Sequence, residues 1–163
     1  MSLLPRSFLP DVYAASVAEM NLAAFKHATL VVFDVDNTLV LPETVEVLDA
    51  TRERVQKISE QKRCVLVSNS RSVKKRTEAL QNIFGCKVFT GFGRKPSKRL
   101  FQRLCADYNV LAKEVVVVGD RLWSDVWFAK RNGAKAILVA PLTSHEAWYI
   151  KLARHFEALL LSL

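Results

Sequence analysis

Short apolar runs rich in β-branched residues alternate along the chain with segments in which apolar side chains recur every three or four positions. The runs predict buried parallel strands at residues 30–33, 64–67, 115–118 and 136–139, with a weaker one at 87–89. The intervening segments predict helices, carried by Val45, Leu48, Val55 and Ile58, by Val73, Leu80 and Ile83, by Leu100, Leu104 and Tyr108, and by residues 126–130. Gly85 and Gly133 follow the second and fourth of these helices and are typical C-terminal caps.

The strict alternation of strand and helix predicts an α/β fold. Because parallel strands are joined by right-handed crossovers, we expect a doubly wound parallel sheet in three layers, a Rossmann-like arrangement. The chain has 163 residues and contains neither repeats nor Gly/Ser linkers, so a single domain over residues 1–163 is expected. Ligands of such sheets bind outside the carboxyl ends of the strands, so functional residues should directly follow the apolar runs.

Two carboxylates follow the first predicted strand. Asp34 and Asp36 are two positions apart, so in an extended chain they project to the same side. Two like charges at one strand end are unfavourable unless one is protonated or a cation holds both, which predicts a divalent metal, an acid/base role, or both. The alternative is a turn stabilised by the side chains of Asp36 and Asn37, and these residues alone do not decide between the two.

Further candidates follow three other strands. Asp120 comes after four valines and a glycine, where an unused acid would be costly, and Asp125 lies one turn into the next helix. Asp125 could instead be a first-turn acid that interacts with the helix dipole. Ser68 and Lys95 follow the second and third strands; singly, one could cap a helix near Ser72 and the other could be a solvated loop cation. Their joint placement favours a phosphate site with carboxylate ligands suited to Mg²⁺.

The four clusters together resemble the four motifs of the haloacid dehalogenase (HAD) superfamily of phosphohydrolases. The matching residues are Asp34-Val35-Asp36-Asn37-Thr38, Ser68, Lys95, and Gly119-Asp120 with Asp125. The resemblance implies that Asp34 attacks phosphorus to form an aspartyl-phosphate. It also implies that Asp36 protonates the leaving alkoxide and then activates water, while Thr38 supports the loop.

The same resemblance implies the cofactor and its ligands. Mg²⁺ would be held by the Asp34 carboxylate, the Asp36 main-chain carbonyl and Asp120, with Asp125 ordering the site. Ser68 and Lys95 would neutralise the oxygens of the transferring phosphoryl group.

The connections between these motifs are too short for the cap domain that many members of the superfamily carry, so the site should be open to a phosphate on a large molecule. Basic residues are dense around the predicted mouth, and a solvated helix face is the alternative explanation for them. We expect substrate binding by Asn69, Arg71, Arg94 and Lys98.

Composition narrows the partners. The 24 Lys and Arg against 16 Asp and Glu give a formal charge of +8, which suits a polyanion, a phosphate ester or an anionic membrane surface. The three cysteines form no CxxC pair, which favours a reducing compartment, and no apolar run is long enough to span a bilayer. Near the C-terminus, residues 148–160 predict an aromatic and basic amphipathic helix, which could lie in a bilayer interface or pack on the sheet.

Taken whole, the sequence resembles the capless phosphatidylglycerophosphate phosphatase family of bacteria and mitochondria. The residues that carry this are Phe8-Leu9-Pro10-Asp11-Val12-Tyr13, the four motifs with Asn69, Pro96 and Leu39, and Asn132-Gly133. The resemblance implies hydrolysis of phosphatidylglycerophosphate to phosphatidylglycerol, a step toward cardiolipin. It places the protein in the cytoplasm and peripheral on the inner membrane face, or on the matrix side in mitochondria. Ser70 and Arg121 depart from the family pattern, which bears on substrate preference.

Two alternatives stay open from the sequence. The same chemistry could act on a soluble phosphate ester or a phosphoprotein, because the catalytic motifs do not fix the substrate. A noncatalytic, basic RNA-binding protein is the other alternative. The complete set of carboxylates and the lack of an aromatic RNA-stacking motif argue against it, so no nucleic-acid partner is expected.

Overall fold

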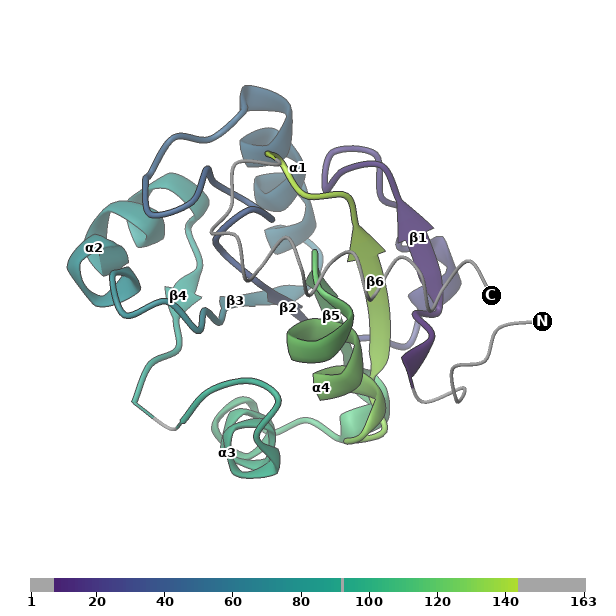
Figure 1. The fold of residues 1–163 in the computed structure, drawn as a ribbon. Coiled ribbons are helices and arrows are strands. Elements are labelled where there is room, and N and C mark those ends of the chain that lie inside the picture. Colours follow the sequence, from purple (N-terminus) through teal and green to yellow (C-terminus); the bar gives the residue numbers. More distant parts are fainter. Residues whose placement is uncertain (1–7, 92, 144–163) are drawn as a thin grey trace.

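The computed structural model describes residues 8–91 and 93–143, and a six-stranded sheet runs through them (Figure 1). All neighbouring strands are parallel, and their order is β1-β6-β5-β2-β3-β4. The strands are β1 (Val12–Ala14), β2 (Leu30–Phe33), β3 (Arg63–Leu66), β4 (Lys87–Val88), β5 (Val115–Gly119) and β6 (Lys135–Val139). The predicted α/β fold with a doubly wound parallel sheet is confirmed.

The register of the central strands aligns their carboxyl ends. Phe33 of β2 pairs with Leu66 of β3 on one side and with Val118 of β5 on the other. The chain therefore leaves β2, β3 and β5 at nearly the same level. Strands β3 and β4 are added on one side of β2, and β5 and β6 on the other, so the strand order reverses between β2 and β5. Crevices at such points are where open α/β sheets bind ligands.

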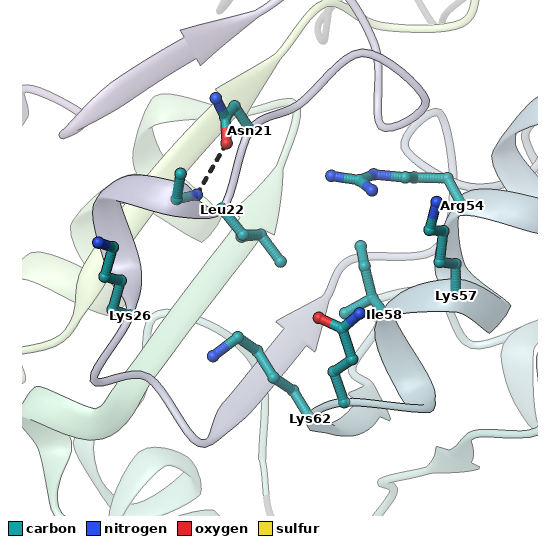
Figure 2. A pocket seen from close by; sticks show the side chains of 9 residues that line it. Asn21, Leu22, Lys26, Arg54, Lys57, Ile58 and Lys62 are labelled. Atoms are coloured by element: carbon teal, nitrogen blue, oxygen red, sulfur yellow. Dashed lines mark hydrogen bonds between the residues drawn. The ribbon is translucent and has the colours of Figure 1, made fainter.

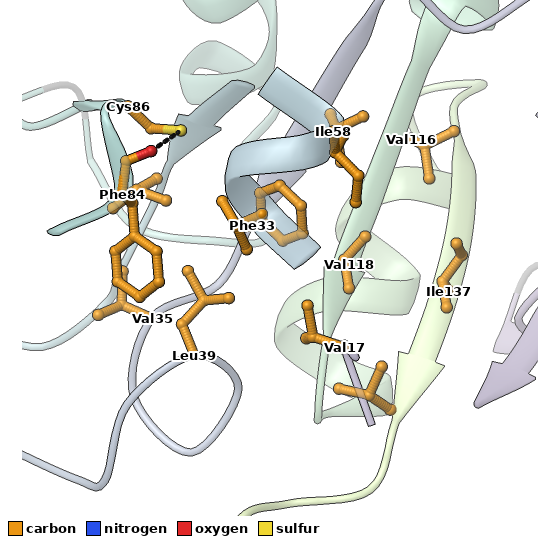
Figure 3. Packing of buried hydrophobic residues seen from close by; sticks show 14 of the residues in the cluster. Val17, Phe33, Val35, Leu39, Ile58, Phe84, Cys86, Val116, Val118 and Ile137 are labelled. Carbon is orange, nitrogen blue, oxygen red and sulfur yellow. Dashed lines mark hydrogen bonds between the residues drawn. The ribbon is translucent and has the colours of Figure 1, made fainter. Parts of the chain in front are cut away.

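Helices cover both faces of the sheet and bury its apolar side chains. On one face, α1 (Asp49–Ser59) and α2 (Val73–Phe84) pack on alternate strand residues such as Val31 and Phe33 (Figure 3). On the other face, α3 (Lys98–Tyr108) and α4 (Trp127–Lys130) pack on the residues between them, such as Leu30 and Val32. Burial on both sides is why these strands read as continuous apolar runs rather than as alternating ones.

Three local features differ from the sequence-based expectations. The first predicted helix begins only at Asp49, and Val45 and Leu48 precede it as exposed side chains. The segment after β5 starts as one π-helical turn, Leu122–Val126, before α4 continues it. Strand β1 was not predicted, because three residues at a sheet edge carry too little pattern. The carboxylate of Asp11 fixes this edge by accepting hydrogen bonds from Ala136 N at 2.9 Å and from two lysines of the neighbouring segment.

The connections around the strand ends are short. Between Thr38 and Ser68 the chain contains α1 and β3, and between Ser68 and Lys95 it contains α2 and β4, residue 92 being outside the described part. No cap domain therefore lies in the described part of these two connections. The predicted amphipathic helix at 148–160 falls outside the described residues. Within the described ranges, none of the helices combines the length and the apolar character needed to cross a bilayer.

Candidate active site

A buried lysine lies between two carboxylates at the carboxyl edge of the sheet. Lys95 follows β4, Asp34 directly follows β2, and Asp125 lies in the π-helical turn after β5. The Lys95 Nζ atom is 2.6 Å from Asp34 Oδ1 and 2.6 Å from Asp125 Oδ1, and its side chain is 1% exposed. The strand ends thus converge as the sequence pattern predicted, and three elements distant in the chain share one ion-pair cluster.

The charges of this cluster depend on one another. Burial by itself lowers the pKa of Lys95, but Asp125 and Asp34 outweigh that effect and hold the pKa above its ordinary value, so the ammonium stays charged. Burial raises the pKa of Asp34, and the neighbouring Asp125 charge adds to the rise, while Lys95 and a hydrogen bond from Thr38 oppose it. Asp34 therefore depends on nearby cations to remain ionised.

Three carboxylates at this edge form a candidate metal site. Asp34, Asp120 and Asp125 each offer an oxygen, and these atoms lie within 4.8 Å of one another. The Thr38 hydroxyl bridges two of them, at 3.1 Å from Asp34 Oδ2 and 3.2 Å from Asp120 Oδ1. Among the described residues, Lys95 is the cation that pairs with these carboxylates, through Asp34 and Asp125, so one positive charge faces three acids and a further cation would be favourable. An all-oxygen ligand set fits a hard ion such as Mg²⁺.

Gly119 makes the position of Asp125 possible. A Cβ atom on Gly119 would lie 2.4 Å from Asp125 Cγ and 2.5 Å from Asp125 Oδ2, closer than non-bonded atoms can approach. The Asp125 carboxylate is also held by the amide of Arg121 and the hydroxyl of Ser124, both at 3.2 Å. The glycine in the fourth motif is therefore required by the space that Asp125 occupies.

Replacement of Gly119 by alanine is expected to displace Asp125, and with it Lys95. We expect kcat/KM to fall by about 100-fold, the order of loss for a displacement of about 1 Å in an active site. Steady-state phosphate release measures the effect. Gly85→Ala is the matched control, because an added Cβ there meets no atom within 4 Å and strains only its left-handed backbone at φ 65°. Wild-type turnover by Gly119→Ala would contradict this role.

The side chain of Asp36 has partners of its own, apart from the Lys95 cluster. It accepts hydrogen bonds from Arg76 Nη2 at 2.9 and 3.1 Å, from Ser68 Oγ at 3.1 Å and from the amide of Glu43 at 2.8 Å. The carboxylate predicted as acid and base is thus 20% exposed and held by donors from three segments. The acid/base role of Asp36 stays a prediction, as does that of its main-chain carbonyl as a metal ligand.

Arg76 is the residue at this site that the sequence did not single out. Its side chain is 10% exposed and also donates to the main-chain oxygen of Thr44, so it connects α2 to the loop after β2. In the sequence it is one of the several basic residues around the predicted mouth of the site. A signal existed: Val73, Arg76 and Leu80 fall on the buried stripe of α2, where a charged side chain needs a partner.

The four predicted substrate-binding residues have different surroundings. Asn69 forms two hydrogen bonds to the main chain of Lys95, accepting from its N at 2.7 Å and donating to its O at 2.9 Å, so it fixes the lysine loop. Arg71 and Arg94 are exposed and line a hollow of about 290 Å³ beside Ser68 and Asn69. Lys98 is exposed at the start of α3 and does not line that hollow. Their roles toward substrate stay predictions.

Comparison with known proteins identifies the family. The family model described as "Mitochondrial PGP phosphatase" matches residues 2–142. The Bacillus subtilis protein named "Probable phosphatase YqeG" is 29% identical over 98% of this chain and 93% of its own length. The chloroplastic phosphatidylglycerophosphate phosphatase 1 of Chlamydomonas reinhardtii is 32% identical over 94% of this chain. This chain spans 59% of the length of that algal protein.

Solved structures share the fold at low sequence identity. The HAD-hydrolase YfnB of Bacillus subtilis, solved bound to magnesium, superposes with a TM-score of 0.61 at 14% identity, covering 83% of this chain and 99% of its own. A haloacid dehalogenase-like hydrolase of Xanthomonas campestris gives a TM-score of 0.55 at 14% identity over 83% of this chain and 96% of its own. With the match over residues 2–142, this chain belongs to the mitochondrial PGP phosphatase family and is a phosphatase of the HAD superfamily.

Proposed function

We propose that this phosphatase hydrolyses phosphatidylglycerophosphate to phosphatidylglycerol and phosphate, with Mg²⁺ and an aspartyl-phosphate intermediate. The observation that carries the proposal is the contact of one buried lysine with two carboxylates, beside a third carboxylate suited to a metal. Asp34 is the nucleophile in this proposal because it directly follows the central strand β2, contacts Lys95, and offers an oxygen within 4.8 Å of those of Asp120 and Asp125. The magnesium-bound structure of YfnB supports the choice of cofactor.

In the first step an Asp34 carboxylate oxygen forms a bond to phosphorus, and the bond from phosphorus to the ester oxygen breaks. The leaving alkoxide takes a proton from Asp36, which Ser68 and Arg76 hold at the adjacent loop. In the second step Asp36 takes a proton from water, whose oxygen attacks phosphorus and releases Asp34 and phosphate. Lys95 stabilises the negative charge on the phosphoryl oxygens in both steps. Bound through Asp34, Asp120, Asp125 and the main chain of Asp36, Mg²⁺ would supply Lewis-acid stabilisation of the same charge.

The hollow beside Ser68 supports a substrate with a second anionic group. Arg71, Lys74 and Arg94 line it, and none of its lining residues is acidic. Phe89 and Leu100 give it apolar walls. A ligand with a terminal phosphate, a second phosphate nearby and an apolar portion fits these walls, and phosphatidylglycerophosphate has all three.

An aromatic cluster near the same edge supports action at a lipid surface. Trp123, in the turn directly after Asp120, is 55% exposed, and its ring lies 4.3 Å from that of Trp127 and 5.9 Å from that of Phe8. The guanidinium of Arg131 lies 4.3 Å from the ring centre of Trp127. Aromatic and cationic side chains together favour the bilayer interface. The proposal therefore locates the enzyme peripherally on an anionic membrane, on the inner or matrix face.

A substrate panel tests the proposal. With Mg²⁺, we expect kcat/KM for phosphatidylglycerophosphate in mixed micelles to be at least about 100-fold higher than for glycerol 3-phosphate, a nucleoside monophosphate or a phosphopeptide. A difference of this size is what a few additional contacts between pocket and substrate provide. EDTA should abolish turnover, and excess Mg²⁺ should restore it. Faster hydrolysis of any soluble ester would contradict the lipid assignment while leaving the phosphatase chemistry in place.

Arg71→Gln/Arg94→Gln tests the second anionic subsite. Loss of these two exposed cations from the hollow should raise KM for phosphatidylglycerophosphate by about tenfold or more, since each charge-assisted hydrogen bond contributes about 1.5–3 kcal/mol. Turnover of p-nitrophenyl phosphate, which has no second phosphate, should stay within about twofold. The exposed pair Lys87→Gln/Lys113→Gln removes the same charge elsewhere and is the control. An equal rise of KM in both double variants would mean that overall charge, and not a subsite in the hollow, causes the effect.

A further inference from the structure

A second basic hollow lies at the amino ends of the strands, opposite the candidate active site at their carboxyl ends (Figure 2). Its volume is about 360 Å³, and it is bounded by the outward face of α1 and by the segment before β2. Lys26 and Lys62 precede β2 and β3, so the hollow faces the amino ends of the strands, whereas Lys95 and Asp34 lie at the carboxyl ends. It is therefore separate from the candidate active site.

Four cationic side chains line this hollow, namely Lys26, Arg54, Lys57 and Lys62, and none of its lining residues is acidic. The remaining lining includes the polar side chains of Asn21 and Gln61 and the apolar side chains of Leu22 and Ile58. Glu60 lines a neighbouring hollow, which shares Lys26, Gln61 and Lys62 with this one. Like charges gathered around one concave space repel one another, so this arrangement is unfavourable unless an anion is bound.

Two of the four cations are positioned by neutral main-chain oxygens rather than by acids. Arg54 Nη2 donates to Met20 O at 2.8 Å, and Lys62 Nζ donates to Ala28 O. These contacts fix the side chains without neutralising their charge. The Nε atom of Arg54 is also buried and has no hydrogen-bond partner among the described residues. Figure 2 shows Arg54 extending from α1 toward the segment of Asn21 and Leu22, across the hollow.

We propose that this hollow is a second binding site, for a compact polyanion that carries two phosphate groups. One phosphate dianion would leave about half of the four positive charges unbalanced, whereas two linked phosphates match them. Arg54 and Lys62 are already anchored and would provide a fixed pair of donors. Lys26 and Lys57 are exposed, and no described residue forms a hydrogen bond or ion pair with either side chain, so both can turn toward a ligand. A soluble diphosphate ester and a phosphorylated lipid headgroup share this chemistry.

Amide chemical-shift mapping of the full chain with Mg²⁺ tests the proposal, because it separates the two edges of the sheet. The probe for a soluble ligand is methylenediphosphonate, which contains no hydrolysable bond between its phosphorus atoms. The probe for a lipid headgroup is a phosphatidylcholine vesicle containing phosphatidylinositol 4-phosphate, whose headgroup carries two phosphate groups. We expect saturable shifts of the amides of Asn21, Leu22, Gln61 and Lys62 with the first probe, with a Kd below about 1 mM.

Lys26→Gln/Lys57→Gln should weaken this binding by at least about tenfold, as expected for the loss of two charged donors. Its turnover of p-nitrophenyl phosphate should stay at the wild-type level, which shows that the variant folds. Arg52→Gln/Lys87→Gln removes the same charge outside the hollow and should change the Kd by less than about twofold.

If the soluble probe causes no shifts, but Lys26→Gln/Lys57→Gln loses vesicle binding while Arg52→Gln/Lys87→Gln retains it, the result would support the site and assign it to a lipid headgroup. No saturable shift with either probe, shifts confined to the Ser68 edge, or equal weakening in both double variants would overturn the proposal. None of these outcomes depends on which ester the active site hydrolyses, so the proposed function stands or fails separately.

Discussion

Asp34→Asn is expected to lower kcat by at least about 10⁴-fold, because an amide oxygen cannot replace the carboxylate as the attacking group. Phosphate release from phosphatidylglycerophosphate and from p-nitrophenyl phosphate should fall together, since the loss lies in the chemical step. Acid quenching of the wild-type enzyme with ³²P-labelled substrate should trap label on the protein. The label should be absent from Asp34→Asn.

The fold of Asp34→Asn should survive. Burial disfavours the ionised form of Asp34, and Asp125 repels it, so a neutral side chain of the same shape removes an unfavourable charge while Lys95 keeps Asp125 as its partner. We expect the free energy of unfolding to change by less than about 1.5 kcal/mol, the range of one hydrogen bond. Asp49→Asn, on the exposed start of α1, is the control for loss of one carboxylate. Residual turnover above about 1% in Asp34→Asn would rule out Asp34 as nucleophile.

Lys95→Met is expected to damage both stability and catalysis. Removal of the ammonium leaves Asp34 and Asp125 facing each other in a buried site without their common partner. Loss of one partner from a buried ion pair costs about 3–5 kcal/mol, so chemical denaturation without metal should show a loss of that order. Because the phosphoryl oxygens also lose a cation, kcat should fall by about 10³-fold.

Magnesium separates the two effects of Lys95→Met. A divalent cation on the three carboxylates should restore part of the lost stability, because it supplies positive charge to the same oxygens. It should not restore kcat, because the phosphoryl oxygens still lack the Lys95 ammonium. Lys113→Met, an exposed lysine, should change neither stability nor turnover appreciably and serves as the control. Equal stability of Lys95→Met and wild type without metal would contradict the ion-pair cluster.

The different stability effects expected for these two substitutions come from one arrangement. Among the described residues that form the cluster around Lys95, three are acids and one is a base, so neutralising one acid costs little and neutralising the base costs much more. This imbalance favours recruitment of a metal.

Most of the sheet and most of the cluster could be predicted from the chain alone. Fully buried parallel strands need apolar residues at every position, and this requirement makes them visible as runs. A polar residue that directly follows such a run must lie at the carboxyl end of that strand, where ligands of these sheets bind. Position in the sequence therefore translates directly into position in space for Asp34, Lys95 and Asp120, which the structure brings to one edge.

Other features had no local signal. Strand β1 exists because β6 offers an edge and Asp11 binds the amide of Ala136 across it. Asn69 sits next to a predicted catalytic serine, yet its amide group binds the main chain of Lys95. Val45 and Leu48 fit a helical period but precede the helix as exposed side chains. For β1 and Asn69 the partner is distant in the chain, so the local periodicity of the sequence does not reveal it.

The sequence by itself determined the fold class. It also determined which strands end in polar residues and which kinds of side chain these are, because burial and strand geometry act on each segment locally. Only the tertiary structure decided which charges pair. In the folded protein Lys95 pairs with Asp34 and Asp125, and Asp36 pairs with Arg76. Four cationic side chains line one hollow at the amino ends of the strands, and none of its lining residues is acidic. Pairing depends on distances of a few ångströms between segments far apart in the chain, and those distances exist only after the strands and helices have packed.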